Sequence, residues 1–71
     1  MEISSFLNMN LQKGDGLLLK YYTGEVLQGN YRGDYDPNEI SFSFFNQSTG
    51  EIQTVAIQRL LNLDVTSRAS S

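Results

Sequence analysis

The sequence predicts an all-β fold, a small five-stranded antiparallel barrel with a short N-terminal helix or arm. Short runs of alternating apolar and polar residues recur along the chain, turn sequences with glycine separate them, and no segment has the period of a long helix. Residues 1–65 are expected to form a single barrel domain, and residues 66–71 a disordered polar tail.

Residues 1–11 fit two interpretations. Ile3, Leu7 and Leu11 recur at four-residue spacing, as on a helix, whereas the last five of these residues alternate as in a strand. A short helix would cover an open end of the barrel with Phe6, Leu7 and Leu11. A frayed arm, ordered only by a neighbouring molecule, fits equally well, and both interpretations stay open.

The first hairpin is expected around Thr23 and Gly24. Residues 17–22 and 25–32 on either side suit strands, and the glycine supplies the positive φ that a tight turn requires. Gly29 lies inside the second of these strands, where glycine marks a bulge or a close backbone approach. We therefore expect Gly29 at a bend that closes the barrel.

Residues 33–38 are expected to form a turn, because proline fixes its own φ and Asp or Asn side chains bond nearby backbone amides. The order of acids and glycine does not fit a calcium-binding EF-hand loop, so no metal site is predicted. Residues 39–45 follow as the third strand, with Ile40, Phe42 and Phe44 facing the core and the serines between them facing outward.

Residues 46–50 are a second polar hairpin connection, and residues 51–58 suit a fourth strand. The alternation is interrupted at residues 59–60, which predicts one helical turn that redirects the chain. The core residues expected in the last strand are Leu61, Leu63 and Val65.

A chain of 71 residues buries only about 60% of the surface that its unfolded form exposes, so its core needs a supplement. The sequence has no Cys and no His, which excludes disulfides and the usual zinc sites, and we expect a homo-oligomer instead. No window approaches the ~20 apolar residues of a membrane span, so a cytoplasmic protein without membrane contact is expected.

The usual catalytic groupings are missing from this sequence. Without His or Cys, and without a nucleophile elbow or a phosphate-binding glycine loop, the chain is not expected to be an enzyme or to bind a cofactor.

Five short segments carry a family pattern: Phe6-Leu7-Asn8, Tyr22-Thr23-Gly24, Leu27-Gln28-Gly29, Ala56-Ile57 and Val65-Thr66-Ser67-Arg68. Together they resemble the Sm-like family, and within it the bacterial Hfq branch. The resemblance implies an SH3/Sm-like barrel and a ring in which the fourth strand of one protomer pairs with the fifth of the next. It also implies that single-stranded RNA binds on the ring faces.

The resemblance carries three tentative RNA-binding residues to this chain, Gly24, Leu27 and Gln28, which match positions of the family's adenosine-binding face. The family's Tyr-Lys-His, which contacts uridines on the other face, reads Gln53-Thr54-Val55 here. The basic rim of the family's N-terminal helix is missing as well. The uridine pocket is therefore not expected in this protein.

Two functions follow from these observations. The first is a non-enzymatic, ring-forming module that binds single-stranded RNA in post-transcriptional regulation, favoured by the family match at residues 24–29. The second is an acidic protein-interaction adaptor that docks a basic protein partner. The net charge of -3 and the loss of the uridine pocket favour this second function, and both stay open.

Overall fold

The computed structural model describes residues 1–69 and contains one antiparallel five-stranded sheet with the strand order β4-β3-β2-β1-β5. In chain order the elements are α1 (Ile3–Asn8), β1 (Gly16–Tyr21), β2 (Val26–Asp36), β3 (Ser41–Asn46), β4 (Glu51–Ala56), the 3-10 turn η1 (Ile57–Arg59) and β5 (Leu60–Ser67). The predicted all-β class is confirmed, and the N-terminal segment forms a short helix rather than an extended arm.

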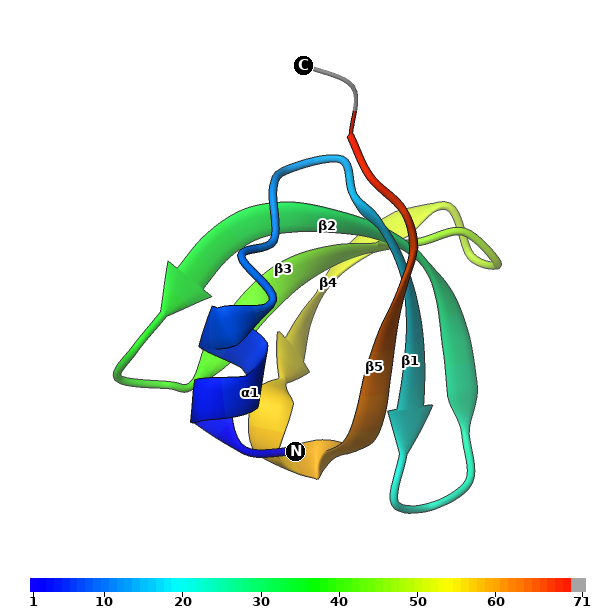
Figure 1. Ribbon diagram of the computed structural model, residues 1–71. Coiled ribbons are helices and arrows are strands. Elements are labelled where there is room, and N and C mark those ends of the chain that lie inside the picture. The colour runs from blue at the N-terminus through cyan, green and yellow to red at the C-terminus, as the bar shows by residue number, and fades with distance from the viewer. Residues whose placement is uncertain (70–71) are drawn as a thin grey trace.

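The sheet curls around a compact apolar core, and α1 lies across one opening (Figure 1). Phe6 of α1 is buried and stacks on Phe42 of β3, with ring centroids 5.2 Å apart, so this part of the predicted lid is confirmed. Leu11 packs against the core as well. Leu7 was expected to join them, but it is 53% exposed because it lies on the outer side of the six-residue helix.

The β2 strand is longer than predicted and runs through the first part of the expected turn. Gly33 and Asp34 have φ values of 87° and 55°, and the pairing of β2 with β3 shifts register on both sides of Gly33. The two residues therefore bend the strand by a bulge instead of ending it. The true turn is shorter, and β3 begins at Ser41 rather than at residue 39. Ser41, which pairs with Asp36 of β2 and Ala56 of β4, is buried, contrary to prediction.

Gly29 lies at a close backbone approach, as predicted. It pairs with Leu17 of β1 on one side and Asn46 of β3 on the other. A Cβ atom at this position would overlap the carbonyl oxygen of Phe45 and reach the ring of Phe44. Only glycine fits here without moving the neighbouring strand.

The core positions of β5 differ from the prediction. Leu60 and Leu63 are buried, whereas Leu61 is 47% exposed. The pairing of β1 with β5 shifts register between Lys20 and Tyr21, so that Tyr21 lies opposite Leu60. This irregularity gives β5 one extra residue, which turns Leu61 outward.

The C-terminal end is more ordered than predicted. β5 continues to Ser67, two residues beyond the expected domain end, and Arg68 forms an ion pair with the buried Asp15 at 3.1 Å. The backbone N–H of Ala69 donates to the same carboxylate at 2.6 Å. These contacts tie the chain end to the loop before β1. The rest of the expected tail, residues 70–71, lies outside the described residues.

Candidate functional site

The three RNA-binding residues predicted by resemblance point in different directions. Gly24 lies at the tip of the β1–β2 turn with a φ of 93°, and no atom lies within 4 Å of a Cβ built there. Leu27 pairs with Leu19 and packs against the core. Gln28 is exposed on the outer face of the sheet, the face turned away from the core. The structure therefore does not bring these residues together into one pocket within a single subunit.

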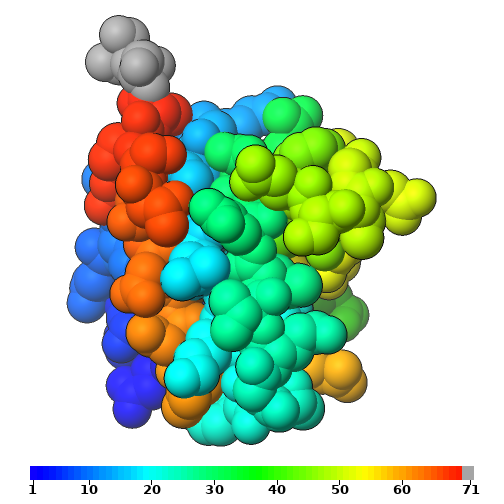
Figure 2. Space-filling view, turned by 90° about the vertical axis from the view of Figure 1, so that its right-hand side faces the viewer, coloured from blue at the N-terminus to red at the C-terminus, as the bar shows by residue number. Residues whose placement is uncertain are grey.

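The outer face around Gln28 carries charges of both signs. Figure 2 shows β5, β1 and β2 side by side on this face, with the β3–β4 turn projecting beyond them. The exposed Lys20 lies diagonally across from Gln28, because Lys20 pairs with Val26 in β2. Asp64 of β5 lies level with Gln28 across the sheet, because Leu18 of β1 pairs with both residues. One ammonium and one carboxylate thus lie close to the Gln28 amide.

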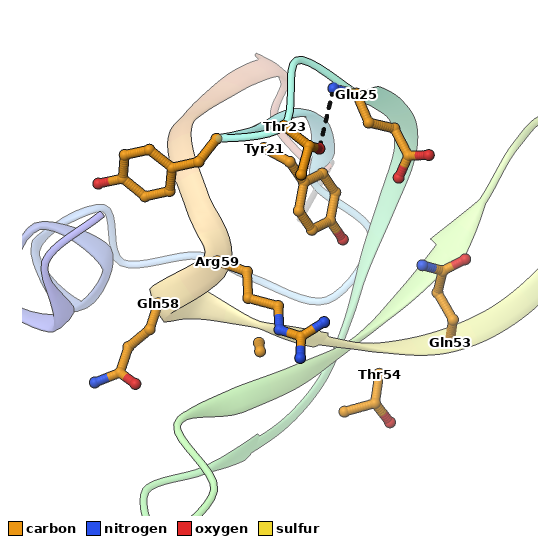
Figure 3. A pocket seen from close by; sticks show the side chains of 9 residues that line it. Tyr21, Thr23, Glu25, Gln53, Thr54, Gln58 and Arg59 are labelled. Carbon is orange, nitrogen blue, oxygen red and sulfur yellow. Dashed lines mark hydrogen bonds between the residues drawn. The ribbon is translucent and has the colours of Figure 1, made fainter.

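A separate groove of about 820 Å³ lies at the open end of the barrel, between the β1–β2 turn and the β4–η1 segment. We call it the Arg59 groove. The polar and aromatic residues that characterise it are Tyr21, Tyr22, Glu25, Gln53, Gln58 and Arg59. Figure 3 shows the Tyr21 ring directed into the groove, toward the guanidinium of Arg59, with the Glu25 carboxylate on the same turn.

Backbone hydrogen bonds fix the wall of this groove that carries the tyrosines. The N–H of Tyr21 donates to the carbonyl of Glu25 at 2.8 Å, and the N–H of Gly24 donates to the carbonyl of Tyr21 at 3.0 Å. The N–H of Tyr22 donates to the carbonyl of Arg59 at 3.3 Å, which joins the turn to η1. This last bond ties the β1–β2 turn, which forms one wall of the groove, to η1, which belongs to the other wall.

The electrostatics of the groove centre on Tyr21. Burial raises the pKa of its phenol above the ordinary value of 10.0, the Glu25 carboxylate raises it further, and the Arg59 guanidinium acts in the opposite direction. The hydroxyl thus stays protonated at neutral pH and can donate a hydrogen bond. Within residues 1–69 the one ion pair is Arg68 with Asp15, so Arg59 has no carboxylate within 4.0 Å.

The sequence contains each residue of this groove but no motif that joins them. Tyr21 and Tyr22 stand out as aromatic residues that can stack on a base, whereas Arg59 stands out only as an interruption of the strand pattern. They meet because β5 pairs with β1, which brings η1 beside the first turn. The pair of adjacent tyrosines before the glycine turn is the one local signal in the sequence for this region.

Among the described residues, no group of three or more His, Cys, Asp or Glu is arranged to hold a metal ion. Nor does this part of the chain include a helix with the length and apolar character needed to cross a membrane.

Comparisons of the chain with protein-family models, with curated proteins and with solved structures give no match. The relationship to the Sm-like family therefore stays a prediction from the short segments quoted above.

Proposed function

We propose that this chain is a non-enzymatic, Sm-like module that assembles with copies of itself into a ring and binds single-stranded RNA in the cytoplasm. The observation that carries the proposal is that the sheet ends in two strands with one neighbour each, β4 and β5. The free edge of such a strand presents N–H and C=O groups that pair readily with another chain. Pairing β4 of one copy with β5 of the next repeats head to tail and closes as a ring.

Exposed apolar side chains on these two strands support the same assembly. Ile52 of β4 is 59% exposed and Leu61 of β5 is 47% exposed. A pairing of the two edges would remove part of this apolar surface from water, at about 25 cal/mol per Å². The gain matters for a chain of 71 residues, whose own core is small.

Sedimentation equilibrium tests the assembly. We expect the wild-type protein to have the mass of several subunits at micromolar concentration. Ile52→Lys should shift it toward the monomer, because a lysine places charge on the edge of β4. Leu7→Lys is the matched control, since Leu7 is similarly exposed but lies on α1, and it should leave the mass unchanged. A wild-type mass of one subunit would contradict the ring.

RNA binding is supported by the outer face around Gln28. The exposed amide offers both a donor and an acceptor to a base edge, and the neighbouring Lys20 attracts phosphate. The net charge of -3 works against binding elsewhere on the surface. Binding should therefore be weak and sensitive to salt, because few phosphates are neutralised.

Fluorescence anisotropy with A-rich and U-rich oligomers tests this part of the proposal. We expect tighter binding to the A-rich oligomer, and a loss of about three- to tenfold in affinity for it in Gln28→Ala, the effect of one neutral hydrogen bond. Gln12→Ala, which removes an exposed amide from the loop before β1, is the control. An assembled protein that binds neither oligomer at low salt would instead favour the acidic adaptor that docks a basic protein.

A further inference from the structure

We propose that the Arg59 groove binds a guanine nucleotide, with the Glu25 carboxylate on the base edge and the Arg59 guanidinium on the phosphate. The groove lies at the open end of the barrel, whereas Gln28 lies on the outer face of the sheet and does not line it. The site is therefore separate from the RNA contact proposed above and can be tested without it. It does include β4, whose outer edge the proposed ring uses, so a bound nucleotide and a neighbouring copy would compete for this edge.

The size and lining of the groove suit a nucleotide. Its volume of about 820 Å³ falls within the range of roughly 300–1,000 Å³ that is common for small-molecule sites. Tyr21 and the 66% exposed Tyr22 supply aromatic faces on which a base can stack. Thr54 and Ala56 of β4 form the opposite side with small side chains that leave room for the ligand.

Opposite charges are arranged around Tyr21 in this groove. Glu25 and Arg59 both act on its phenol, from separate elements and with opposite sign, and within residues 1–69 they form no ion pair with each other. A ligand that spans both groups needs hydrogen-bond donors at one end and an anion at the other. A nucleoside monophosphate can meet both needs and places its flat base beside the tyrosine ring.

Glu25 selects guanine over the other bases. An ionised carboxylate only accepts hydrogen bonds, through two oxygens. Guanine presents two adjacent donors on its Watson–Crick edge, N1–H and the N2 amino group, which match the two oxygens. Adenine and cytosine present one amino group beside an acceptor nitrogen, and uracil presents one N–H between two carbonyl oxygens, so each would set an acceptor against the carboxylate.

Gln53 is positioned to support the same ligand. Its Oε1 accepts a hydrogen bond from Nδ2 of Asn46 at 3.1 Å, which fixes the amide at the edge of the groove. With its oxygen engaged, the Nε2 group has donors left for the ribose hydroxyls or the phosphate. The buried Asn46 is in turn held by the backbone of Ser48, so the orientation is built into the β3–β4 turn.

Isothermal titration calorimetry with GMP, AMP, CMP and UMP tests the inference. We expect GMP to bind about tenfold or more tightly than the others, the discrimination typical of a bidentate base contact. Glu25→Gln should abolish this preference, because an amide has only one acceptor oxygen. Glu51→Gln, which removes an exposed carboxylate at the start of β4 outside the groove, should retain it.

The phosphate contact has its own test. Arg59→Gln should weaken GMP about tenfold and leave guanosine, which has no phosphate, nearly unchanged. Arg32→Gln removes an exposed guanidinium of β2 that does not line the groove, and should have no effect on either ligand. Circular dichroism confirms that each variant is folded. GMP that binds no better than AMP, or a preference that survives Glu25→Gln in the folded variant, overturns the inference.

A guanine nucleotide can come free or within an RNA strand, and a U-rich oligomer with one central guanine distinguishes the two. A gain over the all-U oligomer that Glu25→Gln removes would identify RNA as the source. If GMP binds but the oligomer shows no such gain, the source is the free nucleotide. That second result leaves the guanine site standing even where the protein binds no RNA.

Discussion

The buried carboxylate of Asp15 is the main tie between the C-terminal end of β5 and the loop before β1, and Asp15→Asn tests its strength. Its Oδ2 accepts hydrogen bonds from the N–H of Gln12 at 2.9 Å and from Nη1 of Arg68 at 3.1 Å. Its Oδ1 accepts the N–H of Ala69. The same Arg68 nitrogen donates to the carbonyl of Met9 at 3.2 Å, so one side chain holds three segments together.

An asparagine at this position keeps only one acceptor oxygen. All three partners of the Asp15 carboxylate are donors, so the new amide NH₂ group must face at least one of them and leave it unpaired. Hydrogen bonds to a charged group contribute about 1.5–3 kcal/mol each. Arg68 is 57% exposed and recovers water on losing its partner, which places the expected cost near 3 kcal/mol. For a domain of this size that lowers the Tm by about 12–24 °C.

Thermal and urea unfolding followed by circular dichroism measures the effect. Asp64→Asn is the matched control, because Asp64 is also an acid near this end of the chain but is exposed on β5. We expect the control to change the free energy of unfolding by less than about 0.5 kcal/mol. If the two variants melt within a few degrees of each other, the Asp15 tie does not contribute as described.

The same tie makes stability depend on pH. The backbone N–H groups of Gln12 and Ala69 lower the pKa of the Asp15 carboxyl below its ordinary value of 3.8, burial opposes them, and Arg68 adds to the lowering. A native pKa below the unfolded one means that the contribution is complete above pH 3.8 and is lost as pH falls through the native value. The wild-type protein should therefore lose more stability than Asp15→Asn on acidification from neutral pH to below the native pKa.

Two further substitutions test the packing of the barrel. Gly29→Val should lower the free energy of unfolding by about 3 kcal/mol or more, because its Cβ would meet the neighbouring strand. Gly50→Ala, at an open turn position with a φ of 74°, should cost about 1–2 kcal/mol. Equal melting temperatures of the two variants would refute the closing role of Gly29. Phe6→Ala should lower the free energy of unfolding in urea by about 3–5 kcal/mol, because it removes the ring that stacks on Phe42 beneath α1. A loss of stability no larger than that of Leu7→Ala, at an exposed position of the same helix, would show that α1 does not cover the core.

The five strands and the two glycine-containing hairpin turns at residues 23–24 and 46–50 were predictable because each depends on a local pattern. Phe42 and Phe44 alternate with Ser41 and Ser43, and this alternation alone places both aromatic rings in the core. The burial of Leu60 in place of Leu61 could not be predicted in this way. Both are leucines in one apolar run, and the choice between them depends on a register shift against β1, a strand far away in the sequence.

The Arg59 groove depends on tertiary contacts in the same sense. Its two walls come from residues 21–25 and 53–59, and neither wall has a recognisable motif by itself. The tie at Asp15 was equally hidden, because a small polar segment such as residues 66–71 has the composition of a disordered tail. One buried acceptor 53 positions before Arg68 orders part of that segment.

The free strand edges and the groove have a common origin in η1. This turn spans only Ile57–Arg59, with Ile57 buried, and it directs β5 along β1 instead of back along β4. The outer edge of β4 therefore stays unpaired, and the side chains of Gln53 and Thr54 on that strand remain open to the groove. A hairpin that joined β4 directly to β5 would pair these edges within one subunit and fill the same space. The three residues of η1 thus leave the β4 edge of this small barrel open, and the proposed neighbouring copy and the proposed ligand would compete for it.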